Sequence, residues 1–594
     1  MLYSFFCCNF AEKYETMKHL NRFINTDYLM LFVLSVVNLL FLHHQFLQTI
    51  GLESDCFKTS YFDNLLACLL DVSVVLAVVW LITLRRLRLS LGITFIITLL
   101  WSFCNVFYAR FFQQYLSWSS MGQAGNLADE IVIDSMMAGF SLIDLYYPLA
   151  AVLFGWLYFR SRHHDIVTKS LTTTLVVWGC TLMIGLAVHL TYLVHPTKTV
   201  VYVYGKTMFT PPLYNSLWPN WTVFHKGTIR RLVLDNIFYS SKIALTPDKR
   251  EKIEKEYTNH QQRKTQKTLP DSIKNVIFII VESYLASTSD LIVDGKEITP
   301  NLNRLKHANN VYYNGHMRPN IATGESSDGQ FIYMTGLLPL HSEITVSKAK
   351  YNTLIGLPKQ LKDAIPKMQS AILIPTNPTL WEQDIMSPSY GFDKLYSKID
   401  YQKDMNDRDD SDMGDDKIFA YASEKGQLLS QPFYFMILTM STHHPYTTYV
   451  KHDFQIKDKN LTEKYKNYLI TCHYTDMMLG KYLQYLQKEG LYDTSMIIIV
   501  SDHDAHLKFL DMEGIISNEL PVYIINGGID KDKAWAGECN QLDVYTTILD
   551  IMGVESEWRG LGHTLLNTDY QNSVNDDIQE LSDWIIYGDY FKLR

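Results

Sequence analysis

Long apolar runs fill the first third of the chain, whereas short apolar segments alternate with helical patterns from residue 271 onward. A water-soluble helix of such length would carry a charged stripe, and the long runs have none. Five of them approach the length that a helix needs to cross a bilayer, at about 28–49, 62–84, 90–112, 141–160 and 171–194. The pattern predicts a transmembrane domain of five spans within residues 1–195.

The charges around these spans predict their orientation. Basic residues crowd the segment before the first span and the loops after the second and the fourth, which places those segments in the cytoplasm. An odd number of spans then puts the C-terminal domain on the outer face of the cell (plasma or inner) membrane. The charged residues Asp71, Arg110 and Asp144 lie inside spans, and we expect each to face a neighbouring helix or the interface. No small-residue cleavage site follows the first run, which predicts an anchor.

Residues 196–270 predict interfacial helices and a linker between the two halves. Trp218, Trp221 and Phe224 are amphipathic or aromatic side chains that suit a membrane interface. The segment 248–267 is densely and alternately charged, which is typical of a solvated helix or spacer.

Residues 271–594 predict an extracytoplasmic α/β domain with a mostly parallel central sheet. Thr299 and Pro300 predict a helix start with the threonine as cap, and residues 461–488 predict a long amphipathic helix. The candidate strands are 275–282, 370–375, 433–440, 495–501 and 520–525.

Two of these strands end in acidic residues. Glu282 closes the first strand, and Asp502 and His503 follow the strand at 495–501. In open α/β sheets the reactive groups lie just beyond the carboxyl ends of strands. Two carboxylates and an imidazole suit a divalent ion such as Mn²⁺ or Zn²⁺. One acid after a strand is more often a plain loop carboxylate, but two such ends favour a metal site.

The segment Gly324-Glu-Ser-Ser-Asp328 supplies candidate hydroxyl nucleophiles in Ser326 and Ser327. A serine becomes a nucleophile when a base or a metal ionises it. The alternative is a serine that caps a helix beginning near Asp328. Both interpretations are compatible, because a helix N-terminus also stabilises an anionic phosphate.

Two further residues are candidates for contact with a substrate. His443 follows the predicted strand that ends at Met440, and it would bind a phosphoryl oxygen or transfer a proton. The alternative is a turn histidine that packs against Pro445 and Tyr446. Trp381 would line a pocket or fill the core.

Cysteine use and net charge add little. Cys472 and Cys539, the two cysteines of the outer domain, would form a disulfide in an oxidising compartment or stay as two separate buried thiols. The net charge of −9 gives no sign of nucleic-acid binding.

Taken in order, these segments resemble the lipoteichoic acid synthase family, which are membrane phosphoglycerol transferases of the alkaline phosphatase and sulfatase superfamily. They span nearly the whole chain, and that order is more specific than any single motif. The matching pieces are the five-span N-terminus, Asn275–Ser283, Thr299–Leu305, Gly324–Asp328, Trp381, Tyr390–Asp393, Thr442–Tyr446 and Ser501–His503.

The resemblance implies a role for each matching residue. Ser326 takes the place of a threonine nucleophile that also touches the metal. Glu282, Asp502 and His503 match the other ligands of a single ion, for which Mn²⁺ is expected and Zn²⁺ or Mg²⁺ are alternatives. The residues that match contacts to the phosphoglycerol headgroup are His443 and Trp381.

Three departures bear on the substrate. The nucleophile motif of the family is usually Gly-Lys-Thr-Ser-Asp, so Glu325 replaces a lysine here. Gln383 stands in the substrate pocket at the place of an arginine, and Ile374-Pro375 stand where the family has a histidine. Losing a cation and an imidazole weakens the hold on an anionic headgroup, so the donor need not be phosphatidylglycerol.

Residues and resemblance together predict a metal-dependent transferase of the cell envelope. It would move a phosphoglycerol-type headgroup from a membrane phospholipid, through a covalent phospho-Ser326, to a hydroxyl of a glycolipid or glycan acceptor. A phosphoethanolamine transferase is the closest alternative. A sulfatase or phosphodiesterase hydrolase is less favoured, because the serines lack the following Pro and Arg of the sulfatase motif. An inactive sensor or binding protein would usually have lost a ligand or the nucleophile.

Overall fold

The chain divides into two compact units, the first made of Met1–Ser117 and Gly139–Ile237, the second of Trp118–Ala138 and Phe238–Arg594. The computed structural model describes residues 26–50, 61–112, 114–117, 139–161, 201–203, 206–208, 223–224, 227–232, 244–261 and 267–593, with gaps at 342, 410, 448–453, 557 and 573, and the single positions 133, 137, 179 and 183. The predicted boundaries at 195 and 270 stay predictions.

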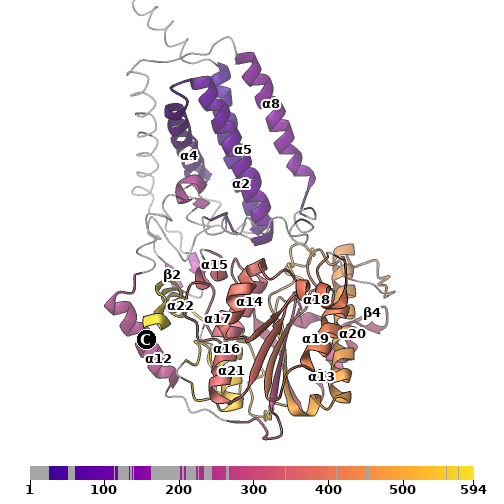
Figure 1. The fold of residues 1–594 in the computed structure, drawn as a ribbon. Helices are drawn as coiled ribbons and strands as arrows, with labels where there is room; N and C mark the ends of the chain where they lie inside the picture. Colours follow the sequence, from indigo (N-terminus) through magenta and orange to yellow (C-terminus); the bar gives the residue numbers. More distant parts are fainter. Residues whose placement is uncertain are drawn as a thin grey trace, which may run out of the picture. The chain divides into compact units, whose positions relative to one another are not determined.

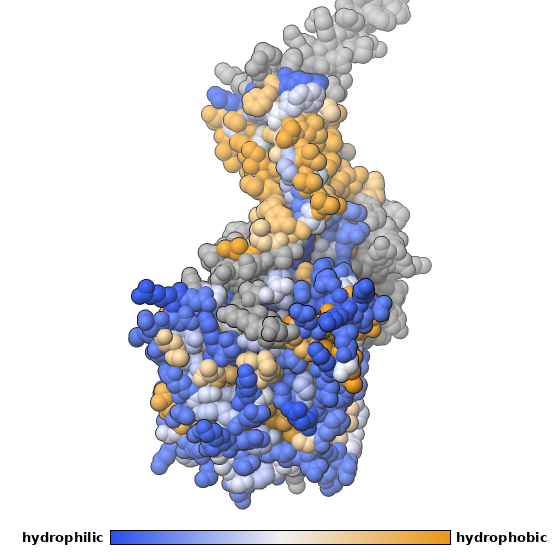
Figure 2. Space-filling view, turned by 90° about the vertical axis from the view of Figure 1, so that its right-hand side faces the viewer, coloured by the Kyte–Doolittle hydropathy of each residue, from blue (hydrophilic) through white to orange (hydrophobic). Residues whose placement is uncertain are grey.

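The first unit is a bundle of apolar helices (Figure 1). Its described residues include four helices that are long and apolar enough to cross a membrane, and hydrophobic side chains cover much of their surface (Figure 2). The fifth predicted span, 171–194, lies almost wholly outside the described residues. The helices are α2 (Thr26–Ile50), α4 (Tyr61–Ile82), α5 (Leu87–Phe112) and α8 (Tyr146–Arg160), the last preceded by the 3₁₀ turn η2 (Leu142–Leu145).

The charged residues inside the spans have partners, as the sequence predicted. The fully buried Asp71 carboxylate accepts a hydrogen bond from Arg230 Nε at 2.7 Å and another from the backbone N–H of Ile229 at 3.0 Å. Arg110 and Asp144 form a two-pronged ion pair at 2.7 and 2.8 Å. Pairing removes the cost of an isolated charge in hydrocarbon.

The second unit is built on an eight-stranded sheet of order β12-β6-β11-β10-β3-β9-β7-β8. Its centre is parallel, from β10 through β3, β9 and β7 to β8, and this confirms the predicted mostly parallel sheet. Only β11 turns antiparallel to both of its neighbours. The strands are β3 (Asn275–Val281), β6 (Val311–Arg318), β7 (Gln369–Leu373), β8 (Lys394–Tyr396), β9 (Phe433–Leu438), β10 (Ser495–Ser501), β11 (Leu520–Ile525) and β12 (Cys539–Asn540).

The sequence missed three of these strands, β6, β8 and β12. Strand β6 has the polar-rich sequence Val-Tyr-Tyr-Asn-Gly-His-Met-Arg. This matches its place near one end of the sheet, where buried residues are mixed with half-buried and exposed ones. Strands β8 and β12 are edge strands of three and two residues, too short to produce a pattern.

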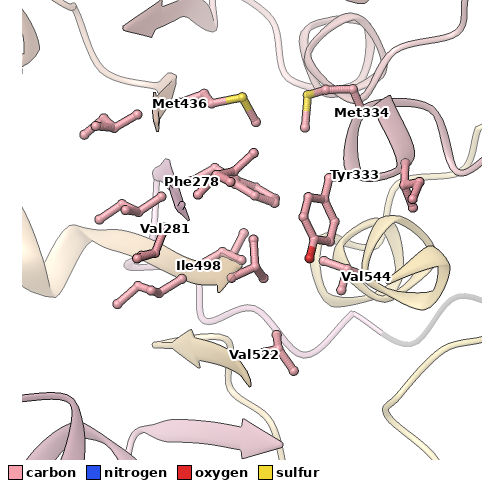
Figure 3. Close-up of a cluster of buried hydrophobic side chains, with 14 of the residues drawn as sticks. Phe278, Val281, Tyr333, Met334, Met436, Ile498, Val522 and Val544 are labelled. Carbon is pink, nitrogen blue, oxygen red and sulfur yellow. The ribbon is translucent and has the colours of Figure 1, made fainter. Parts of the chain in front are cut away.

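Helices cover both faces of this sheet (Figure 1). One face is covered by α14 (Ser326–Thr335), α16 (Leu357–Ala364) and α21 (Leu542–Met552); the other by α13 (Pro300–Lys306), α19 (Asp415–Gly426) and α20 (Glu463–Lys488). Figure 3 shows the core between the sheet and α14, where Phe278 faces Tyr333 with ring centroids 5.7 Å apart. The predicted helix 461–488 is confirmed as α20.

Two local predictions are settled by the packing. The Thr299 side chain does not cap α13, because its hydroxyl donates to the backbone carbonyl of Thr288 and to the side-chain Oδ1 of Asn303. The Asp476 carboxylate of α20 accepts the N–H groups of Asn301 and Leu302 instead. Cys472 and Cys539 are separate buried thiols, the second of the two alternatives.

Candidate metal and nucleophile site

The three predicted metal ligands meet at the carboxyl ends of two adjacent parallel strands. Val281, the last residue of β3, pairs with Ser501, the last residue of β10, so the residues that follow them lie side by side. One ligand atom each from Glu282, Asp502 and His503 lies within 4.8 Å of the others, and all three residues are buried. The sheet register therefore builds the cluster that the strand ends predicted.

Ser326 completes the cluster as the first residue of α14. Its Oγ donates a hydrogen bond to Glu282 Oε2 at 3.0 Å and lies 3.1 Å from His503 Nε2. The predicted helix start is thus confirmed two residues earlier than Asp328. The neighbouring Ser327 is excluded from the cluster, because its buried hydroxyl donates to the Gly324 carbonyl at 2.6 Å.

Hydrogen bonds orient His503 and Asp502 so that one atom of each faces Glu282 or the other residue. His503 Nδ1 donates to the Asp504 carbonyl at 2.7 Å, which turns the Nε2 of a neutral imidazole toward Glu282 and Asp502 at 3.2 and 3.6 Å. Asp502 Oδ1 accepts the N–H groups of Ser283 and His503, each at 2.8 Å, so Oδ2 is the atom turned to the centre. Two carboxylates and one oriented imidazole fit a divalent cation.

The charges of the cluster are strongly coupled. Burial raises the pKa of Glu282, but the imidazoles of His503 and His443 outweigh it and hold that pKa well below its usual range. Burial lowers the pKa of His503, yet Asp502 and Glu282 raise it well above its usual range. Without a metal, protons therefore supply the positive charge that the carboxylates require.

His443 lies on the loop after β9, close enough for its charge to act on Glu282. Its Nδ1 donates to the His444 carbonyl at 2.6 Å, which leaves Nε2 for proton exchange. Asp415 braces this loop, a role that the sequence did not reveal: its Oδ1 accepts the N–H groups of Met440 and Ser441 at 2.9 and 3.0 Å.

The two remaining predicted substrate residues differ in placement. Trp381 is partly buried, packs against the core and has a positive φ of 53°. Gln383 is 4% exposed, and its amide hydrogen-bonds Gln330 at 2.5 Å and Ser387 at 3.1 Å. Gln330 is one turn beyond Ser326 on α14. The Gln383 amide therefore hydrogen-bonds buried side chains next to the site.

Sequence reasoning did not assign two residues that the fold brings to the cluster, Glu325 and His506. Together with His503 they form a second group whose ligand atoms lie within 4.8 Å of one another. Burial raises the pKa of Glu325 to about 8, with His503 acting in the opposite direction. A second histidine follows His503 three residues later, in Asp502-His-Asp-Ala-His506, and this spacing was the signal in the sequence that could have indicated His506.

Backbone strain concentrates around these groups. Positive φ in a residue other than glycine is uncommon and is maintained only where the surroundings enforce it. The non-glycine residues with positive φ in and beside the site are Ser283, Glu325, Trp381, Tyr446 and His506.

The comparisons agree with this geometry. Residues 274–554 match the sulfatase family model. Lipoteichoic acid synthase of Staphylococcus saprophyticus is 26% identical over 509 residues, which cover 81% of this chain and 75% of that protein. Lipoteichoic acid synthase 2 of Bacillus subtilis is 30% identical over 311 residues, but this match spans only 48% of the chain and 46% of the relative.

A solved structure extends the likeness to the whole fold. The lipooligosaccharide phosphoethanolamine transferase A of Neisseria meningitidis, an integral membrane protein, covers 94% of this chain and 98% of its own, with a TM-score of 0.50 and 14% identity. Within the second unit, residues 274–554 are thus similar to the sulfatase family, and the first unit contains helices that are long and apolar enough to cross a membrane. In sequence the chain is similar to lipoteichoic acid synthases over most of its length.

Proposed function

We propose that this chain is a membrane phosphotransferase that moves the phosphate-linked headgroup of a phospholipid to an acceptor hydroxyl. The observation that carries the proposal is the position of Ser326 Oγ, 3.0 Å from Glu282 Oε2 and 3.1 Å from His503 Nε2 at the metal-type cluster. The lipoteichoic acid synthase relatives support the phosphotransferase class, and the apolar helices support a lipid substrate.

Glu282, Asp502 and His503 would hold the ion, with Ser326 as its fourth contact; Mn²⁺ is our first choice and Zn²⁺ or Mg²⁺ are alternatives. When bound, a divalent ion favours the ionised serine and offsets negative charge on the phosphoryl oxygens.

The protein groups carry two displacements. Ser326 Oγ forms a bond to phosphorus as the bond from phosphorus to the diacylglycerol oxygen breaks. The acceptor oxygen then forms its bond to phosphorus as the Ser326 ester breaks. His443, through Nε2, would protonate the leaving diacylglycerol and later take the proton of the acceptor hydroxyl. The N-terminus of α14, which begins at Ser326, favours the phosphate charge.

Two donor headgroups are candidates. The resemblance to the lipoteichoic acid synthase family favours glycerol, and a carboxylate at Glu325 beside the nucleophile favours the ethanolamine alternative. We propose a glycolipid or glycan of the cell envelope as the acceptor, on the outer face of the membrane. Trp381 is proposed to border the headgroup, whereas its neighbour Gln383 would act only through the packing of α14.

The test uses full-length protein in liposomes with Mn²⁺ and follows diacylglycerol release from fluorescent phosphatidylglycerol and phosphatidylethanolamine. Ser326→Ala should lower release by roughly three orders of magnitude. Ser326→Thr should retain activity because it keeps a hydroxyl, and Ser327→Ala is the matched control, since the Ser327 hydroxyl donates to the Gly324 carbonyl and not to the cluster. Release that survives in Ser326→Ala would reject the mechanism.

A further inference from the structure

Glu325 and His506 form a polar group beside the nucleophile that the reaction above does not use. Glu325 directly precedes Ser326, and its Oε2 lies 3.9 Å from His503 Nδ1. A carboxylate oxygen of Glu325, a ring nitrogen of His506 and one of His503 lie within 4.8 Å of one another. The pair therefore borders the side of His503 that faces away from Glu282.

Within the part of the chain that the structure describes, no group lies at hydrogen-bond distance of the Glu325 carboxylate or the His506 ring. The Glu325 side chain is nevertheless only 15% exposed. A covered carboxylate without a partner is unfavourable, and it is held here by a strained backbone with φ 44° at Glu325 and 41° at His506. This arrangement is one that a bound cation would satisfy.

A second metal ion fits this pair poorly. His503 Nδ1, the third member of the group, donates its proton to the Asp504 carbonyl at 2.7 Å and has no lone pair to offer. Glu325 and His506 alone then provide two ligands, one fewer than the three protein ligands of a typical catalytic zinc site. An ammonium group needs no coordination shell of this kind, because it donates hydrogen bonds to a carboxylate and to a neutral imidazole nitrogen.

The position of the pair limits the length of the ligand. The phosphorus of the donor must reach Ser326 Oγ, and Glu325 is the adjacent residue. A cation that binds Glu325 while its phosphate meets Ser326 must be joined to that phosphate by a short arm. The two-carbon arm of ethanolamine meets this requirement, whereas the glycerol headgroup offers hydroxyls and no charge.

We propose that Glu325 and His506 bind the ammonium group of a phosphoethanolamine headgroup, which makes an amino-phospholipid the preferred donor. The proposal rests on the proposed phosphotransferase reaction and narrows its donor to one of the two candidates. Bond making and breaking are as described above: phosphorus passes from the diacylglycerol oxygen to Ser326 Oγ and then to the acceptor oxygen. The ammonium keeps its protons throughout.

The experiment compares phosphatidylethanolamine and phosphatidylglycerol, separately and as an equal mixture, on the full-length protein in liposomes with Mn²⁺. We expect the wild type to prefer phosphatidylethanolamine. Glu325→Gln, which keeps the shape but removes the charge, should lower kcat/KM for that lipid by about tenfold or more and leave phosphatidylglycerol within about twofold. His506→Gln should act in the same direction, and Glu325→Asp, which keeps the charge, should retain part of the preference.

Glu538→Gln is the matched control, because Glu538 pairs with Arg318 at the end of β6, two strands away from β10 in the sheet. Thermal unfolding of each variant checks that it folds, and metal analysis gives ions per chain. Three results would each overturn the ammonium subsite. The wild type could prefer phosphatidylglycerol, the Glu325→Gln variant could lose activity equally on both lipids, or the wild type could bind two ions per chain and Glu325→Gln one. Release from neither lipid, or release that survives Ser326→Ala, would instead reject the phosphotransferase reaction itself.

Discussion

Gly329 lies directly against the backbone of Asp502. A Cβ atom built on Gly329 would fall 2.4 Å from the Asp502 carbonyl oxygen and 2.8 Å from its Cα. Gly329 is on α14, one turn from the proposed nucleophile Ser326, and Asp502 is a proposed metal ligand at the end of β10. The contact thus sets how closely α14 approaches the cluster of proposed ligands.

We predict that Gly329→Ala moves α14 away from the end of β10, because the obstructing atoms are backbone and cannot rotate aside. The free energy of unfolding should fall by about 1–3 kcal/mol, and diacylglycerol release should fall further than this loss of folded protein explains. Urea unfolding and turnover on one sample measure both. Gly426→Ala is the control, since its nearest atom is Phe435 Cε1 at 3.7 Å; equal effects in the two variants would contradict the close-approach argument.

Metal removal should destabilise the second unit, since the buried carboxylates then depend on protons for positive charge. After chelation, we expect Mn²⁺ at about a hundred times its Kd to add roughly 2.7 kcal/mol and so to raise the unfolding temperature. Asp502→Asn should abolish the increase, and Asp530→Asn, an exposed partner of Lys533, should not. Scanning calorimetry with and without the ion measures the unfolding temperature. If Mn²⁺ still raises that temperature in Asp502→Asn, the proposed set of ligands is wrong.

Asp543 predicts a pH dependence outside the metal cluster. Burial raises its pKa to about 6, although Tyr570 Oη and the N–H groups of His563 and Asn540 donate to it. The folded state then holds more protons than the unfolded state between the unfolded pKa and the folded one, so stability falls as pH rises from about 4 to about 6 and is level above.

The matched variant for this prediction is Asp543→Asn, which cannot titrate. The stability of the wild type minus that of the variant should decrease by about 3 kcal/mol across this interval. Denaturant unfolding at several pH values measures it. A constant difference would show that the pKa of Asp543 is not raised.

The ion pair of Asp71 and Arg230 should act as a unit. Asp71→Asn leaves the Arg230 guanidinium without its carboxylate, and we expect a lower unfolding temperature in detergent. Adding Arg230→Gln should recover part of the loss, because no unpaired charge then remains. Asp27→Asn is the comparison, since Asp27 pairs with Arg160, which is 52% exposed. Strictly additive losses at Asp71 and Arg230 would show that the pair is not coupled.

Much of this molecule was readable from local pattern. Apolar length gave four described spans, and short apolar runs gave the core strands, because burial on both faces requires continuous apolar side chains. Glu282, Asp502 and His503 were predictable for a related reason, since the ends of parallel strands share one sheet edge. A hydroxyl-rich turn and the resemblance singled out Ser326 as a candidate. In the structure its hydroxyl contacts Glu282, as expected of a residue of the same site.

Other features were decided only by contacts between segments that are distant in the chain. Nothing in its own segment tells that Gln383 turns toward Gln330, that Asp415 braces the loop before His443, or that Asp476 caps α13. The strands β6 and β12 exist because their neighbours supply the pairing.

The sequence by itself determined the apolar helices, the parallel sheet and the meeting of Glu282, Asp502 and His503 at one sheet edge, since these depend on hydrophobic periodicity and strand order. The tertiary structure alone decided which side chains surround Ser326. Glu325 meets His506 because α14 crosses the end of β10 at Gly329, and that crossing depends on the packing of a helix against a sheet, which no local pattern specifies.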